Sequence, residues 1–152
     1  MEKRRPPTVQ AALAVIERQG RYLVCRRRNE DFLGGYWEFP GGKREVGESW
    51  NACLRRELRE ELGVAVTAPR VVGSMRYRYA HRQVFFKVFR CGIAGCRPRP
   101  LEAQALRWVS SAQLRTYRFP PANQGLIAHL SKRSRDVGKT VERQGASWYT
   151  TH

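Results

Sequence analysis

The sequence predicts one α/β domain, built on a mixed β-sheet with helices on both of its faces. Runs of apolar, β-compatible residues are followed by a helical pattern, further strands and a second helical pattern, which is the element order of such a layered fold. At 152 residues the chain is long enough for one domain with a proper core and short for two. It contains no internal repeat and no run of about 18 apolar residues, so we expect no membrane span.

The first forty residues predict an arm, two strands and a loop. Residues 1–7 form a basic arm closed by two prolines, and we expect the domain itself over residues 8–134. The runs at 8–17 and 21–27 are β-compatible, and the "RQGR" between them indicates a hairpin. The Gly- and aromatic-rich stretch that follows predicts a loop with a short extended piece at "YWEF".

A helix is expected from Ser49 to Leu62. Ser49 is a favoured N-cap residue, and Gly63 is the residue type that most often ends a helix. Apolar residues recur at four-residue intervals along this segment and predict one buried face: Trp50, Leu54, Leu58 and Leu62.

The second half of the chain predicts four more strands and two helical segments. The strands are expected at 64–68, 70–83, 84–93 and 105–110, a short helix or turn at 111–119, and a final helix at 122–133. Residues 135–152 show little periodicity, and we expect a tail of unknown role there.

Composition narrows the possible functions. Four scattered cysteines form no C-x-x-C pair, and with three histidines they predict buried free thiols in a reducing, cytoplasmic setting instead of a zinc site. The formal charge of +16 would attract polyanions such as nucleotides, RNA or DNA. The usual nucleic-acid motifs are absent, so a nucleic-acid partner is possible but not required. The oligomeric state stays open.

The acidic residues are concentrated in one part of this basic chain. Six of the thirteen lie between Glu38 and Glu61. Glu57, Glu60 and Glu61 stand at i, i+3 and i+4 of the expected helix, so their carboxylates gather on one edge. Glu61 falls within the angular range of the apolar face, where an unpaired carboxylate is costly to bury.

Two interpretations of this acidic edge are open. The segment "RRELREEL" could be a solvated helix face held by Arg–Glu pairs such as Arg56–Glu60. Alternatively, a hard divalent cation could offset the repulsion between the glutamates, and such ions at carboxylate clusters usually meet the phosphates of a substrate. Gly41 would let the backbone approach a metal or phosphate closely, and Glu48 enters the helix facing the same cluster.

The same segment resembles the Nudix box, G-x5-E-x7-R-E-U-x-E-E-x-G-U with U an aliphatic residue. The chain matches all nine defined positions over 23 residues: Gly42, Glu48, Arg56, Glu57, Leu58, Glu60, Glu61, Gly63 and Val64. The resemblance implies an α/β/α sandwich in which the box forms a loop–helix–loop. It also implies Mg²⁺-dependent, or Mn²⁺-dependent, hydrolysis of a nucleoside diphosphate linked to another group.

The resemblance implies roles for the box residues by position. Glu60 and Glu61 would be metal ligands together with the carbonyl of Gly41. Glu57 would ligate metal or act as general base towards the attacking water, and which glutamate is the base differs among family members. Glu48 would support the cluster, and Arg56 would orient its glutamates by pairing.

Residues outside the box narrow the resemblance to the MutT branch, which hydrolyses oxidised nucleotides such as 8-oxo-dGTP to the monophosphate and pyrophosphate. "WEFPGGK" and "FPPAN" are both similar to MutT, and Asn123 would read the purine edge. Glu102 matches a further metal-site carboxylate, and Phe39 would help line the base pocket. Arg27 and Arg82 correspond to nucleotide-contacting positions.

Alternatives remain at each level. Asn123 could be a helix N-cap, and Glu102 a plain loop carboxylate. The substrate could instead be CTP or dCTP, a dinucleoside polyphosphate, or capped or 5′-triphosphate RNA. The domain could also be a non-catalytic nucleotide-binding module, although such modules commonly lose the box glutamates, which are all present here.

Overall fold

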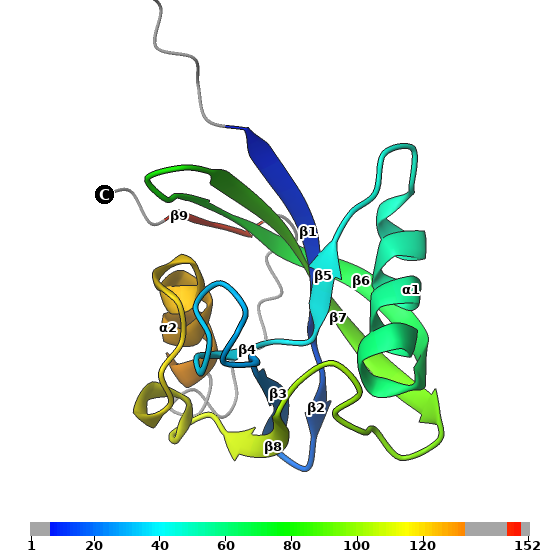
Figure 1. Cartoon of the computed structure of the whole chain (residues 1–152). Coiled ribbons are helices and arrows are strands. Elements are labelled where there is room, and N and C mark those ends of the chain that lie inside the picture. The colour runs from blue at the N-terminus through cyan, green and yellow to red at the C-terminus, as the bar shows by residue number, and fades with distance from the viewer. Residues whose placement is uncertain (1–6, 133–145, 150–152) are drawn as a thin grey trace, which may run out of the picture.

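A computed structural model of the chain describes residues 7–132 and the backbone of residues 146–149 (Figure 1). The elements in chain order are β1 (Thr8–Val15), β2 (Glu17–Arg18), β3 (Arg21–Arg26), β4 (Trp37–Glu38), β5 (Gly41–Lys43), α1 (Trp50–Leu62), β6 (Val64–Arg78), β7 (Gln83–Gly95), β8 (Ala105–Ser110), the 3-10 turns η1 (Leu114–Thr116) and η2 (Pro121–Asn123), α2 (Gln124–Lys132) and β9 (Ala146–Tyr149). Among these residues, no helix is both long and apolar enough to cross a membrane.

The strands form the expected mixed sheet and a second, smaller sheet that the sequence did not indicate. The mixed sheet has the order β5-β1-β7-β6-β9, with β1 parallel to β7 and β9 parallel to β6. The second sheet is antiparallel and joins β2, β3, β4 and β8. The chain passes from one sheet to the other at Ile16, between β1 and β2.

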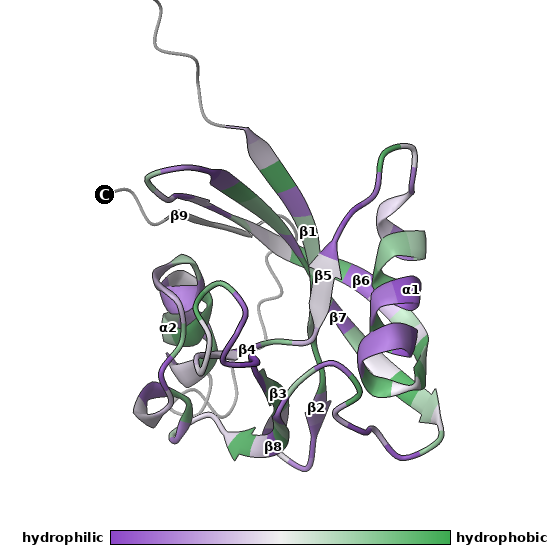
Figure 2. Cartoon of the chain, viewed as in Figure 1, coloured by the Kyte–Doolittle hydropathy of each residue, from purple (hydrophilic) through white to green (hydrophobic). Residues whose placement is uncertain are grey.

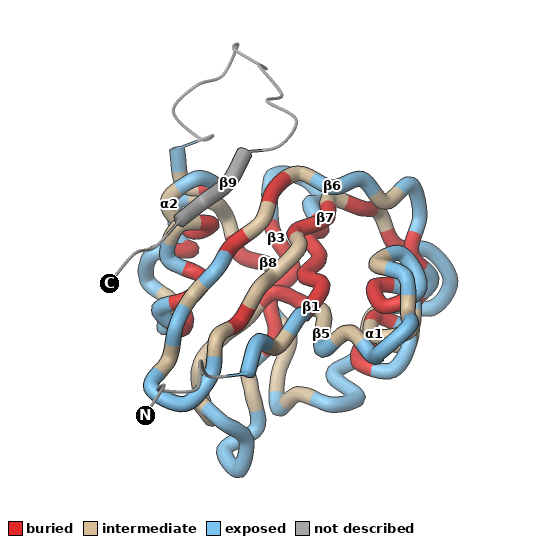
Figure 3. Tube along the Cα trace, turned by 90° about the horizontal axis from the view of Figure 1, so that it is seen from above, coloured by how far each residue is buried: buried red, intermediate tan, exposed pale blue. Residues whose placement is uncertain are grey.

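Alternate residues of β1 point into two different cores. Ala12 and Ala14 pack with α1, whereas Leu13 and Val15 pack with α2. Because side chains of a strand alternate between faces, a strand that is apolar at every position is buried on both sides. Helices therefore cover the two faces of the sheet, as predicted, and the most buried segments lie between α1 and α2 (Figure 3).

The local signals of the helix are confirmed. The hydroxyl of Ser49 accepts a hydrogen bond from the N–H of Ala52 at 3.1 Å, and Gly63 ends α1 in the left-handed conformation at φ 72°. The predicted "RQGR" hairpin also forms, with Gln19 and Gly20 at positive φ between β2 and β3.

Two strand predictions are wrong in their limits. The segments expected at 64–68 and 70–83 form one strand, β6, because a register shift near Pro69 absorbs the irregular residues without ending the pairing with β7. The strand stops at Arg78, since residues 79–82 form the turn into β7 with Tyr79 N–H bonded to the Arg82 carbonyl at 2.8 Å.

The ends of the domain differ in part from the expectation. The final helix, α2, covers Gln124–Lys132 and is preceded by the turn η2. The segment expected to be a tail contains β9, which pairs with Gly73–Arg76 of β6 at the sheet edge. Residues 1–6 of the predicted arm and most of that tail lie outside the described residues.

Candidate active site

Arg56 joins the carboxylates at the outer edge of α1. Its Nε and Nη2 atoms donate to the two carboxylate oxygens of Glu48 at 2.7 and 2.9 Å. Its Nη1 atom donates to Glu57 at 2.7 Å and to Glu60 at 3.4 Å, and Nη2 also donates to the Lys43 carbonyl at 2.9 Å. The guanidinium lowers the pKa of Glu48 to about 2. One planar cation thus holds three glutamates that would otherwise repel one another.

Glu61 points inward, as its place on the helix wheel predicts, and is only 5% exposed. One of its oxygens accepts a hydrogen bond from the Gly41 N–H at 3.0 Å. Burial and then the nearby carboxylate of Glu38 raise the pKa of Glu61, and together they bring it to about 8 against the lowering effects of Gly41 and the Cys25 thiol. This carboxylate is therefore costly to ionise unless a cation is bound beside it.

Glu57 rests against the backbone of β5. A side chain on Gly42 would place its Cβ atom 2.2 Å from a carboxylate oxygen of Glu57, so a larger residue there would displace this carboxylate from its observed position. Burial raises the pKa of Glu57, against the lowering effect of Arg56, and the charges of Glu60 and Glu102 raise it as well. Hydrophilic residues accordingly line the part of α1 that lies alongside β5 (Figure 2).

Glu102 reaches the site from the loop between β7 and β8. This loop is tied to the end of α1, because the N–H groups of Arg99 and Leu101 donate to the carbonyls of Leu62 and Glu61, each at 3.0 Å. The side chain of Glu102 is exposed and close enough for its charge to raise the pKa of Glu57. The structure therefore brings together five carboxylates named from the sequence: Glu48, Glu57, Glu60, Glu61 and Glu102.

Glu38 is a further site carboxylate that the sequence analysis did not assign. It lies in β4 opposite Cys25 of β3, and its charge acts on Glu61. Arg27 donates to it at 2.8 Å and to the Phe32 carbonyl at 2.7 Å, so this ion pair fixes the loop before β4. A signal was present, since Glu38 is the first of the six clustered acids and alternates with two apolar neighbours.

The oxygen atoms of this site suit a hard divalent cation. In the described part of the chain no three His, Cys, Asp or Glu side chains converge closely enough to hold one. Arg56 holds Glu57 and Glu60, and the Gly41 N–H holds Glu61, so these carboxylates would have to rotate to share an ion. The donor set fits nonetheless: it consists of oxygens only, and burial, followed by the charge of neighbouring carboxylates, raises the pKa of Glu57 and Glu61, which a bound cation would offset.

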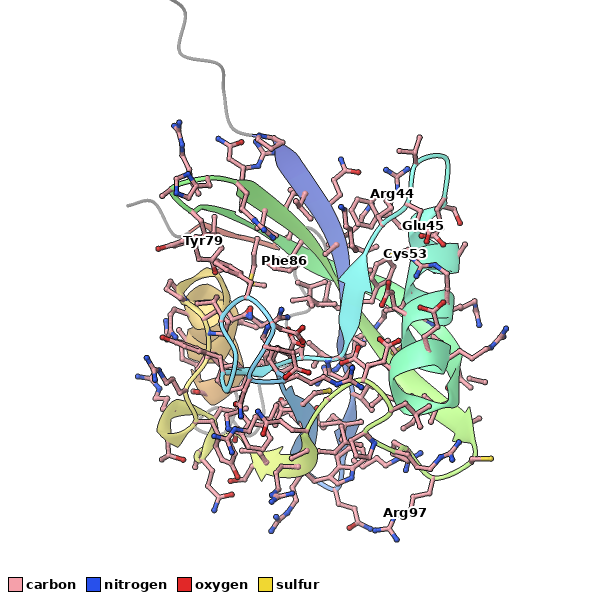
Figure 4. All side chains as sticks on the ribbon, in the orientation of Figure 1. Arg44, Glu45, Cys53, Tyr79, Phe86 and Arg97 are labelled. Atoms are coloured by element: carbon pink, nitrogen blue, oxygen red, sulfur yellow. The ribbon has the colours of Figure 1, made fainter. Side chains whose placement is uncertain are left out.

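A second cluster lies on the other face of the sheet, towards α2. Asn123 is 3% exposed, and its Oδ1 atom accepts no hydrogen bond from any described residue. Tyr79 is close to the backbone of Ala122, and its ring meets Phe32 edge-on at 5.4 Å. The guanidinium of Arg82 lies 4.9 Å from the centre of the Phe32 ring. Figure 4 shows Tyr79 on the α2 side of the sheet, with Phe86 on the same side.

The surroundings of two predicted binding residues, Phe39 and Asn123, show what each side chain contacts in the folded protein. The ring of Phe39 is 1% exposed and stacks on Phe119 at 5.4 Å, so it supports the "FPPAN" segment from within the core. Asn123 precedes α2, but its side-chain Oδ1 atom accepts no hydrogen bond from a backbone N–H, so it does not cap that helix as the alternative interpretation required.

The comparisons with known proteins agree with this arrangement. The family model described as NUDIX domain matches residues 11–129. The chain belongs to the Nudix family. It is a Nudix hydrolase that acts on diphosphate bonds, and every defined position of its Nudix box lies in the continuous segment from β5 to the first residue of β6.

Relatives carry names for two kinds of nucleotide substrate. The chain is 34% identical over 119 residues to the CTP pyrophosphohydrolase of Escherichia coli, and the matched region covers 78% of this chain and 88% of the relative. It is 30% identical over 125 residues to the 8-oxo-dGTP diphosphatase of the same organism, covering 82% and 97%. The solution structure of the E. coli ORF135 protein is similar with a TM-score of 0.74 at 32% identity, covering 88% of this chain and 96% of that one.

Proposed function

We propose that this Nudix hydrolase cleaves a nucleoside triphosphate to the monophosphate and pyrophosphate, with oxidised purines such as 8-oxo-dGTP as preferred substrates. The observation that carries the base preference is the buried Oδ1 atom of Asn123, an acceptor without a donor among the described residues. A buried polar atom left unpaired costs about 1–3 kcal/mol, so a ligand that supplies an N–H gains that amount.

The chemistry of the oxidised base explains why such an acceptor discriminates. In guanine, the N7 atom is a hydrogen-bond acceptor, and it would face Oδ1 lone pair to lone pair. Oxidation at C8 turns N7 into an N–H donor, which matches that acceptor. The amide of Asn123 offers a donor beside the acceptor, so it can bind the neighbouring O6 as well. Arg82, Phe32 and Tyr79 are proposed to enclose the base from the other side.

The phosphates would lie over the glutamate cluster. When bound, Mg²⁺ or Mn²⁺ held by Glu57, Glu60, Glu61 and the Gly41 carbonyl, with Glu102 beside them, would neutralise the diphosphate and align the attacking water with phosphorus. Arg27 borders the cluster through Glu38 and offers a cation to the phosphates.

Within this arrangement each box residue has a distinct task. Glu57 is proposed as the general base, because burial raises the pKa of its carboxyl group and favours proton acceptance from water. Arg56 and Glu48 are proposed as positioning residues, since they hold Glu57 through the Nη1 contact of the same guanidinium. The binding-module alternative gains no support, because all these groups are present together.

A competition panel tests the proposal. We would compare kcat/KM for 8-oxo-dGTP, dGTP, dCTP, CTP, diadenosine tetraphosphate and 5′-triphosphate RNA, with Mg²⁺ or Mn²⁺ and with pyrophosphate and phosphate measured separately. Preference for 8-oxo-dGTP with pyrophosphate release would support the proposal. Preference for CTP, the substrate in the name of one relative, would refute the base assignment and keep the hydrolase.

A further inference from the structure

The part of the mixed sheet near the N-terminal end of β1, at the top of Figure 1, carries a basic and aromatic surface that the active site does not use. The sheet extends beyond the start of α1, and the exposed strip is built by cross-strand neighbours: Gln10 pairs with Phe85, and Phe85 with Arg76. Lys87 lies two residues along β7 on the same face. We call this surface the basic ledge; it consists of Gln10, Arg44, Trp50, Arg76, Arg78, Phe85 and Lys87.

The cationic groups of the basic ledge are held against its two aromatic rings. The guanidinium of Arg44 and the ammonium of Lys87 lie 5.1 and 5.3 Å from the centre of the Trp50 ring. Arg76 lies 5.4 Å from the centre of the Phe85 ring, and the rings of Trp50 and Phe85 are 5.9 Å apart. Such contacts order long side chains in advance, and Arg44 is held further because its Nη1 atom donates to the Gln10 side chain at 2.6 Å.

Three cations of the basic ledge have no acidic partner among the described residues. No described carboxylate forms an ion pair with Arg44, Arg76 or Lys87, and the one backbone carbonyl that Arg44 binds belongs to Glu48, at 2.7 Å. Like charges on one surface repel, so their gathering lowers stability until an anion binds. In a chain of charge +16, charge complementarity points to a polyanion.

We propose that the basic ledge binds single-stranded nucleic acid. Strands lie about 4.8 Å apart, so a strip of three strands is about 10–15 Å wide and suits one phosphate backbone better than the two of a duplex. Half-buried aromatic rings beside the cations offer edges on which unpaired bases can pack.

The basic ledge touches the active site at Arg44, whose Nε atom donates to the Glu48 carbonyl, whereas Arg76 and Lys87 pack on the rings of Phe85 and Trp50. A helix rises about 1.5 Å per residue, so Trp50 is about 10 Å along α1 from Glu57. The base-pocket cluster lies on the opposite face of the sheet, towards α2, whereas Arg44 lies beside β1 on the α1 side (Figure 4). The inference therefore does not depend on the proposed substrate, and its test can be run without hydrolysis.

The test is fluorescence anisotropy with a 5′-fluorescein-labelled oligo(dT) 12-mer in EDTA, over a series of salt concentrations. The variant Arg76→Gln/Lys87→Gln removes two charges from the basic ledge. The control Arg107→Gln/Arg115→Gln removes two exposed charges from β8 and η1. We expect the ledge variant to bind about tenfold more weakly and its salt slope to fall by about 1.4, at about 0.7 per phosphate contact, with the control close to the native protein.

Equal weakening of both variants would overturn the proposal, because net charge alone would then explain the attraction. Absence of binding by the native protein would overturn it directly. Tighter binding of a duplex of the same length, of poly-glutamate or of anionic vesicles would overturn it in favour of another partner. Equal melting temperatures and equal circular dichroism spectra for the native protein and the ledge variant would show that the fold is intact. If the ledge variant fails to fold, Arg76→Gln/Arg78→Gln, which changes only exposed side chains, replaces it in the same assay.

Discussion

Replacing Asn123 by alanine separates recognition from folding. The side chain is 3% exposed and its Oδ1 atom has no donor among the described residues. In the free protein this atom contributes an unpaired acceptor, which costs about 1–3 kcal/mol, so removing it offsets the packing that the shorter side chain loses. We expect the free energy of unfolding without ligand to change by less than about 1 kcal/mol.

The same substitution has a larger effect on substrate choice. If the N7–H of 8-oxoguanine pairs with Oδ1, losing that pair costs about 1–3 kcal/mol in the transition state, which corresponds to about 5- to 150-fold in kcat/KM. For dGTP, whose N7 lone pair opposes Oδ1, the same change removes a repulsion. The ratio of the two kcat/KM values should therefore fall by at least about tenfold.

The assay is competition between 8-oxo-dGTP and dGTP, with urea unfolding measured in parallel. Gln124→Ala is the matched control, because this neighbouring amide donates to the Phe119 carbonyl at 3.2 Å and has a structural contact only. It should lower stability by about 1 kcal/mol and leave the ratio unchanged. An unchanged ratio in Asn123→Ala, or a loss of stability above about 3 kcal/mol, would refute the recognition role and leave a core residue.

Three further predictions concern the glutamate cluster. Glu57→Gln should cut kcat by orders of magnitude with an unchanged circular dichroism spectrum, and near-native turnover would remove Glu57 from the mechanism. Arg56→Lys keeps one charge but cannot make the forked contacts to Glu48 and Glu57, so kcat should fall at least about tenfold while Arg59→Lys, an exposed neighbour on α1, has little effect. The pKa of Glu61 is raised from an ordinary value near 4.5 to about 8 in the folded protein. Between pH 4.5 and about 8, the folded protein therefore keeps a proton on Glu61 that the unfolded chain has released. Melting in EDTA should consequently show native stability falling as pH rises from about 5 to 8, and Glu61→Gln should flatten this trend; a parallel profile in the variant would assign the dependence to other groups.

Much of the active site was predictable because its signals are local. The nine positions of the Nudix box lie in one continuous loop and helix, and helical spacing alone places Glu57, Glu60 and Glu61 on one edge. The caps of α1 are equally local, since Ser49 and Gly63 act on backbone groups within one turn. Similarly, the inward position of Glu61 follows from the geometry of a single helix.

Other features depend on contacts between distant segments. Glu38 joins the site because β4 pairs with β3 and brings it beside Glu61, a pairing that no local pattern encodes. The continuation of β6 past Pro69 also depends on its partner, because twelve residue pairs with β7 hold the strand across two register shifts. The addition of β9 likewise requires an open edge on β6.

By itself, the sequence determined the family, the helix that carries the glutamates and the spacing of their carboxylates, because these follow from residues close together in the chain. Only the tertiary structure decided that Arg56 is shared among Glu48, Glu57 and Glu60, that Asn123 is buried with an unpaired oxygen, and that the cations of two strands and a loop form one basic ledge. The physical reason is that burial and cross-strand neighbours arise from packing between segments, so they exist only once the chain has folded.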